Sequence, residues 1–148
     1  MDNRYPSPDS QSGIALLEAL VAILIFSVGI LALVGLQATA IKQSSDARYR
    51  SEAAALANEL IGQMWLVDRT DSTQITTKLQ SDFESPDGPE YKKWATRLSS
   101  LPNGVATVTI DDPGTELAGR VFITIQWRAP NDPADAKPHQ YLSSTMIQ

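Results

Sequence analysis

The chain of 148 residues carries 17 acidic against 12 basic residues, a formal net charge of −5, and has no patch of lysine or arginine, so it lacks the electrostatic footprint of nucleic-acid binding. It contains no cysteine, which excludes disulfides, cysteine-based metal sites and a thiol nucleophile. Once an apolar segment near the N-terminus is set aside, roughly 110 residues remain, enough for one small domain with one modest core.

The first predicted element is a long apolar helix. Ile14 to Leu36 contains only Glu18 and Ser27 as polar residues. These about 23 residues form a helix of roughly 34 Å, which is enough to cross the hydrocarbon layer of a membrane. Three interpretations are open: a secretory signal peptide cut near Ala38–Ala40, an uncleaved membrane anchor, or a segment in which Glu18 has a function. The first fits poorly, because the apolar region is long, Arg4 alone precedes it as a basic residue, and a carboxylate interrupts it.

Glu18 requires an explanation, because an ionisable group in a membrane helix costs about 3 kcal/mol and usually has a partner or a function. In the first turn of a helix, a carboxylate interacts favourably with the helix dipole and with unpaired N–H groups. Cleavage after Gly13 would add a positive α-amine on Ile14, and Glu18 would become the fifth residue of the mature chain. The position of this carboxylate therefore favours a processed helix over a plain anchor.

The stretch "G-IALLE", Gly13 to Glu18, followed by an unbroken apolar helix, resembles the leader junction of type IV pilins and of the pseudopilins of type II secretion. In that family a membrane peptidase cuts after the glycine and methylates the new N-terminus. The fifth mature residue, a glutamate, pairs with the N-terminus of a neighbouring subunit. The resemblance implies that Gly13 is the last leader residue, Ile14 the methylated N-terminus and Glu18 the assembly carboxylate.

The same resemblance implies three segments: a prepilin leader, a transmembrane and assembly half of the long helix, and a periplasmic domain, at residues 1–13, 14–37 and 38–148. The flanking charges favour the opposite topology, because one basic residue precedes the helix and three follow it, Lys42, Arg48 and Arg50. We follow the resemblance, since these three charges are spread along a helix that continues.

The helical pattern does not stop at Gln37. Apolar residues recur at helical spacing further on, with two more beside the stripe: Tyr49, Ala53, Leu56, Leu60 and Met64, then Ile61 and Trp65. This spacing predicts one helix of about 50 residues, from Ile14 to Leu66, apolar all round in its first half and amphipathic in its second. We expect the stripe to pack on the core of the domain.

Downstream elements are shorter. Residues 68–88 predict an irregular connection with a short helical turn around Thr76–Phe83. A second helix is predicted from Pro89, with an apolar stripe, Tyr91, Trp94, Ala95, Leu98 and Leu101. Three strands follow, Val105–Ile110, Val121–Trp127 and Tyr141–Ile147, and their short connections favour an antiparallel meander. A long helix on such a sheet is an α+β fold. The resemblance implies the same arrangement, a pilin-like ladle whose handle is the long helix.

The C-terminal part resembles the PilV-type minor pilins of Gram-negative bacteria, through "W-x3-L-x2-LP-x-G" from Trp94 to Gly104, "ITIQW" and a closing "STMIQ". This implies a minor pilin that takes part in priming type IV pilus assembly, from the inner membrane to the pilus tip. The implied partners are other minor pilins, the major pilin and prepilin peptidase. Two alternatives stay open: a minor pseudopilin of type II secretion, and an uncleaved membrane-anchored periplasmic binding domain.

Residues that could carry chemistry are few. We expect His139, the only histidine, to be solvated in a loop, and Asp111 and Asp112 to cap a turn rather than bind a cation. Ser143 and Ser144 lie on a predicted strand without a base, and there is no glycine-rich phosphate loop. Three tryptophans are expected in the core, Trp65, Trp94 and Trp127. The sequence therefore predicts no catalytic, cofactor or metal site and no small-molecule substrate, and favours a structural protein over an enzyme.

Overall fold

The computed structural model describes residues 12–68, 70, 74–114, 116, 118–130, 132–133 and 135–147. Contacts between residues divide the chain into two compact units, with the boundary between Ser44 and Ser45. Of the first unit, the structure describes residues 12–44, and these are all helical. The second contains two further helices, a 3-10 turn and a sheet, and all the buried apolar residues of the described chain.

Helix α1 spans Ser12–Trp65, 54 residues, and agrees closely with the predicted helix from Ile14 to Leu66. Its end tightens, because the Leu66 N–H donates to the Gln63 carbonyl at 3.1 Å. A short turn follows, in which Asp68 Oδ1 accepts hydrogen bonds from the Thr70 hydroxyl at 2.6 Å and the Thr70 N–H at 3.0 Å. These two bonds, the hydroxyl first, lower the pKa of Asp68 below its ordinary value.

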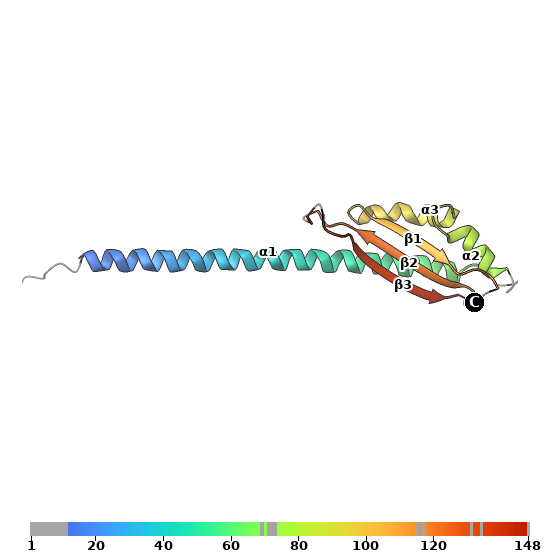
Figure 1. Cartoon of the computed structure of the whole chain (residues 1–148), viewed down its shortest axis with the longest axis horizontal. Helices are drawn as coiled ribbons and strands as arrows, with labels where there is room; N and C mark the ends of the chain where they lie inside the picture. The colour runs from blue at the N-terminus through green and yellow to red at the C-terminus, as the bar shows by residue number, and fades with distance from the viewer. Residues whose placement is uncertain are drawn as a thin grey trace, which may run out of the picture. The chain divides into compact units, whose positions relative to one another are not determined.

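Two short helices connect α1 to the sheet. The connection in which a short helical turn was predicted around Thr76–Phe83 contains a regular helix, α2, at Ile75–Phe83, which buries Ile75, Leu79 and Phe83. Helix α3 spans Pro89–Ala95 and continues as the 3-10 helix η1 at Thr96–Ser100. Both α2 and α3 contact the first strand (Figure 1). The predicted stripe of α3 is confirmed, because Trp94, Leu98 and Leu101 are buried.

The sheet has three antiparallel strands in the order β1-β2-β3, as the meander predicted. Strand β1 spans Val105–Ile110, β2 spans Arg120–Trp127 and β3 spans His139–Met146. Alternation along β2 decides which face is covered, because Val121, Ile123, Ile125 and Trp127 are all buried. The side chains between them lie on the outer face of the sheet.

One core joins α1 to this sheet. Ala53, Leu56, Ala57, Leu60 and Met64 of α1 are buried in one cluster with side chains from α2, α3, η1 and all three strands. The stripe predicted on the second half of α1 therefore does cover the domain's own core, and the α+β fold class is confirmed. Trp65 is an exception to the prediction, because its side chain is 45% exposed. It follows buried Met64 by one residue, a step of about 100° around the helix that turns it out of the stripe.

Gly119 fixes the end of the sheet where β2 begins. Its φ is +81°, and a Cβ added there would lie 2.3 Å from the carbonyl oxygen of Ile147. The Ile147 N–H donates to the Gly119 carbonyl at 2.9 Å. Only glycine combines this left-handed backbone with so close an approach of the opposite strand.

Candidate processing and assembly site

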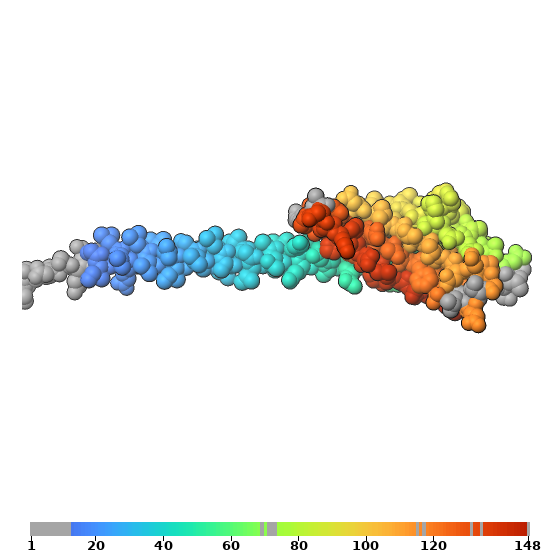
Figure 2. All heavy atoms as spheres, viewed as in Figure 1, coloured from blue at the N-terminus to red at the C-terminus, as the bar shows by residue number. Residues whose placement is uncertain are grey.

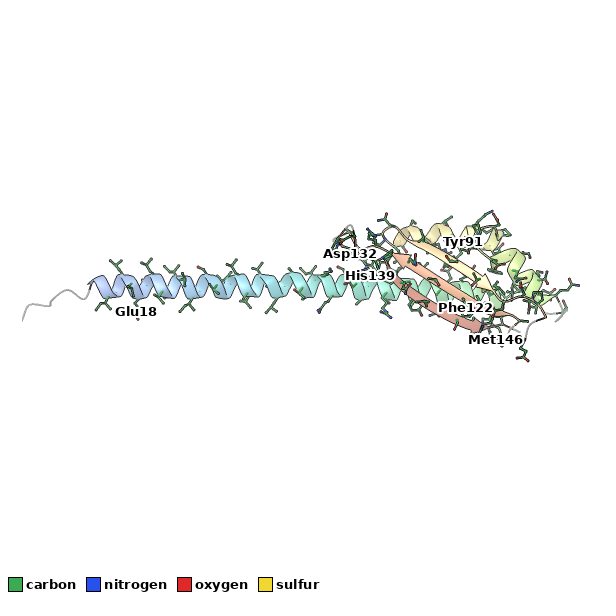
Figure 3. The ribbon with its side chains drawn as sticks, viewed as in Figure 1. Glu18, Tyr91, Phe122, Asp132, His139 and Met146 are labelled. Carbon is green, nitrogen blue, oxygen red and sulfur yellow. The ribbon has the colours of Figure 1, made fainter. Side chains whose placement is uncertain are left out.

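The three residues implied in processing and assembly lie together near the start of α1. Gly13 and Ile14 both have helical backbone, so the bond between them lies inside the helix. Glu18 follows Ile14 by four residues, which places both side chains on one face, about one turn or 5.4 Å apart. Figure 3 shows Glu18 projecting from the side of α1.

The surroundings of Glu18 differ in one respect from the expectation. The helix begins at Ser12 rather than at Ile14, because neither Ser12 nor Gly13 is a proline, which would disfavour helix there. The first turn of this helix contains no acidic residue. Glu18 therefore lies beyond the first turn of the uncleaved helix. Removal of residues up to Gly13 would bring the carboxylate closer to the helix N-terminus, where unpaired N–H groups and the dipole favour negative charge.

The side chains around Glu18 form an apolar surface without cover in the single chain. Every large apolar side chain from Ile14 to Leu36 is exposed, from 44% at Ile30 to 72% at Ile14. Figure 2 shows them as the surface of a single helix, in blue and cyan. Within the described chain, α1 is the one helix that is long and apolar enough to cross a membrane, by its length and composition. Such a surface requires lipid or other helices around it.

Two hydroxyl groups in and just after the apolar half of α1 have their hydrogen-bond partners within the helix. The Ser27 hydroxyl donates to the Ile23 carbonyl at 2.7 Å, and the Thr39 hydroxyl donates to the Gly35 carbonyl at 3.1 Å. Bonds of this kind, four residues back along the helix, hide a hydroxyl from an apolar medium. Glu18 has no hydrogen bond or ion pair to any residue that the structure describes, so its carboxylate remains the exception in this segment.

His139 is not the solvated loop residue that the sequence predicted. It is the first residue of β3, and its ring stacks on Trp127, with centroids 5.8 Å apart and planes inclined by 13°. Its Nε2 lies 2.9 Å from Asp132 Oδ2, which also accepts the Ala129 N–H at 3.0 Å (Figure 3). The sequence did not indicate this contact, because His139 and Asp132 lie seven positions apart in a connection rich in proline. Together, Trp127, Asp132 and His139 hold the β2–β3 connection in place.

A small cavity lies beside this group. It has a volume of about 190 Å³ and is lined by Asp46 and Arg50 of α1 and by Trp127, His139 and Gln140. The Trp127 indole N–H and Asp46 Oδ1 are buried and have no hydrogen-bond partner among the described residues. Sequence reasoning placed Trp127 correctly in the core but gave no sign of these two atoms, because they come from elements far apart in the chain.

The remaining candidates take structural positions. Asp111 Oδ2 accepts from Arg120 Nε at 2.9 Å, and Asp112 Oδ1 accepts from Gln80 Nε2 at 3.1 Å, so both hold the end of β1. Ser143 and Ser144 lie on β3, as predicted. Among the residues that the structure describes, no group of three or more His, Asp or Glu side chains could hold a metal ion.

Comparison with known proteins bears on the N-terminal segment. No curated protein and no solved structure matches the chain significantly. Residues 8–34 match the family model described as the prokaryotic N-terminal methylation motif, which covers Gly13, Ile14, Glu18 and most of the apolar half of α1. The chain thus carries the methylation motif of type IV prepilins at its N-terminus, and this motif supports a pilin-like or pseudopilin-like protein that is processed by prepilin peptidase.

Proposed function

We propose that the chain is a minor pilin of the PilV type that takes part in initiating type IV pilus assembly. Prepilin peptidase cuts it between Gly13 and Ile14 and methylates Ile14. Residues 14–37 anchor it in the inner membrane and later enter the fibre, while residues 38–148 form a periplasmic domain. Its partners are other minor pilins and the major pilin, and its place is at the pilus tip.

The observation that carries this proposal is one carboxylate, Glu18, in an otherwise apolar and exposed half-helix that matches the methylation motif. A passive anchor gains nothing from a carboxylate at this position, because burying it costs about 3 kcal/mol unless it meets a partner. Ser27, the other polar side chain between Ile14 and Leu36, has its partner within the helix. Glu18 therefore supports an interaction with a group that the single chain does not supply.

A neighbouring subunit's α-amine has the chemistry to supply it. When apolar half-helices leave lipid and pack together, an unpaired carboxylate and an unpaired ammonium group are both penalised by the low dielectric. Pairing Glu18 of one subunit with the N-terminus of another removes both penalties at one axial offset between the helices. Glu18 thereby favours one register among many that apolar packing alone would allow.

The test is the intact mass of the full-length protein, purified from membranes with and without a co-expressed prepilin peptidase. We expect the peptidase to remove Met1–Gly13 and to add one methyl group to Ile14. An uncleaved chain in the presence of active peptidase, with a known prepilin processed as the control, would reject the proposal and favour a membrane-anchored binding domain. Expression of this protein in two mutant strains then distinguishes a type IV pilus from type II secretion. A strain that lacks minor pilins should regain pili. A strain that lacks minor pseudopilins should not regain secretion.

A further inference from the structure

The two edge strands of the sheet, β1 and β3, differ in whether their outward-facing backbone groups have hydrogen-bond partners. Along the β1 edge, the chain covers its own backbone: Ser85 bonds to both the N–H and the carbonyl of Val108, at 3.0 and 3.1 Å. The Tyr91 hydroxyl donates to the Ala106 carbonyl at 2.8 Å, and Gln80 Nε2 donates to the Ile110 carbonyl at 3.1 Å. Each outward-facing carbonyl of β1 is thus satisfied from within the fold.

The β3 edge has no such cover. Because the Ile147 N–H donates to Gly119, alternate residues of β3 counted back from Ile147 direct their backbone groups toward β2. The intervening residues Gln140, Leu142 and Ser144 then direct theirs away from the sheet. Among the residues that the structure describes, none bonds to the N–H or carbonyl groups of these three.

The sequence of β3 does not guard this edge. Exposed edge strands are usually protected by lysine, other charges, proline or a bulge. The strand "HQYLSSTM" contains no Lys, Arg, Asp, Glu or Pro, and its pairing with β2 is regular over all eight residues, without a bulge. The edge is thus eight residues long and unbroken, and it carries no acidic, lysine or arginine side chain.

The outer face beside this edge is apolar. Leu142 is 63% exposed, and Phe122 and Met146 are exposed beside it on β2 and β3 (Figure 3). A groove of about 220 Å³ runs between the two strands there, with Phe122, Thr124, Leu142 and Ser144 in its lining. A strand added to β3 would place every second side chain next to Leu142, on the same face as this groove.

We propose that the β3 edge, Gln140 to Ser144, accepts an extended strand from another protein, which pairs by backbone hydrogen bonds and covers Leu142 with uncharged, apolar side chains at alternate positions. A second copy of β3 is the poorer occupant. Antiparallel self-pairing creates a twofold axis, which makes the α1 segments packed on the two sheets run in opposite directions. Two such copies cannot both be anchored in one membrane by α1, so this choice of occupant rests on the proposed anchoring. Parallel self-pairing needs a twofold axis along the strands, which sets Leu142 of the two copies on opposite faces, so their apolar surfaces do not meet.

The test uses the full-length protein in detergent micelles and a fluorescent probe peptide of alternating Thr and Val, with a terminal Lys at each end for solubility. Ser144→Pro removes one outward N–H while leaving every bond between β2 and β3 in place. Ser144→Ala retains that N–H and is the matched control. We expect wild type and Ser144→Ala to bind the peptide equally, and Ser144→Pro to bind it at least about tenfold more weakly.

A second probe keeps the test decisive if Ser144→Pro does not fold. The same peptide, N-methylated at every backbone nitrogen so that neither of its two edges can donate a hydrogen bond, should lose at least about tenfold in affinity for the wild-type protein. Absent binding of the unmodified peptide, or binding that neither change weakens, would overturn the proposal. Self-association of the wild type that Ser144→Pro abolishes would assign the edge to a second copy and overturn it too. The intact mass of the same samples reports leader removal separately.

Discussion

Substitution of Glu18 is expected to reduce pilus assembly without affecting the folding of the sheet domain. Glu18→Ala removes a carboxylate with no partner among the described residues of the single chain, so the sheet domain should keep its stability. If the proposed pairing holds, piliation should fall, because the substitution would leave the neighbouring ammonium group unpaired in the helix bundle, at a cost of about 3–5 kcal/mol. Glu18→Lys should be more severe, since it places two positive charges together.

The measurement is pilus number by electron microscopy, with membrane levels of the protein determined in parallel. Ser27→Ala is the matched control in the same half of α1, because its hydroxyl bonds only within the helix, and it should leave pilus number unchanged. Wild-type piliation in both Glu18 variants would remove the assembly role from this residue.

Tyr91 makes stability depend on pH in the alkaline range. Burial raises the pKa of Tyr91 above its ordinary value of 10.0, and its hydroxyl donates to the Ala106 carbonyl. Because the folded state holds this proton more tightly than the unfolded state, the contribution is fully present below pH 10 and is lost as the pH rises through the folded pKa. The direction is opposite to that of Asp68, whose lowered pKa affects stability only in acid.

Tyr91→Phe removes both the hydrogen bond and this titration. At neutral pH, we expect the variant to be less stable than wild type by about 1 kcal/mol. The difference should shrink as the pH rises above about 10, since only wild type loses this contribution. Urea unfolding followed by circular dichroism at several pH values gives both quantities. A difference that stays constant with pH would contradict the assignment.

At the scale of elements, Trp94 joins α3 to α1. Its buried indole Nε1 donates to the Leu56 carbonyl at 3.0 Å, and its ring contacts Tyr91 with centroids 6.0 Å apart. Trp94→Phe loses this bond and part of the filled volume, so we expect a loss of about 2 kcal/mol or more in the free energy of unfolding. Trp65→Phe is the control on the exposed side of α1 and should change it by less than about 0.5 kcal/mol. Equal effects of the two substitutions would contradict this assignment.

Elements with a strong apolar period could be predicted from the sequence, and those held by distant contacts could not. Both the stripe on α1 and the alternation of β2 identified their buried residues, because each pattern depends on neighbours one turn or two residues away. Helix α2 was underestimated, since Ile75, Leu79 and Phe83 are spaced among polar residues that resemble a loop. His139 was misjudged because its partners, Asp132 and Trp127, are brought to it only by the antiparallel pairing.

The candidate sites divide in the same way. The proposed junction at Gly13, Ile14 and Glu18 is local in sequence, so a short motif is enough to suggest it. The open edge of β3 depends on which strand ends the sheet and on the direction of its backbone groups. The sequence "HQYLSSTM" alone predicts neither its position at the end of the sheet nor the direction of its backbone groups. The contrast with the β1 edge becomes visible only when the structure places Ser85, Tyr91 and Gln80 beside β1.

At the scale of the whole molecule, the apolar half of α1 contributes nothing to the core. Every buried apolar residue of the part of the chain that the structure describes lies between Ala53 and Ile147, within the unit that begins at Ser45. A fragment of residues 45–148 should therefore be soluble, leave the membrane fraction and unfold in one cooperative thermal transition. Circular dichroism during heating tests this. An insoluble fragment, or a transition without cooperativity, would mean that the first unit supports the fold.

The glycine at the end of the sheet limits how this protein can change over generations. Gly119 faces the Ile147 carbonyl at a distance that leaves no room for a Cβ, and its φ of +81° disfavours every other amino acid. Any missense change in its codon introduces a Cβ, so selection should remove such alleles whatever side chain they encode. In a deep mutational scan that selects only for folding, almost no substitution at position 119 should survive, whereas the outward positions of β3 should accept many residues.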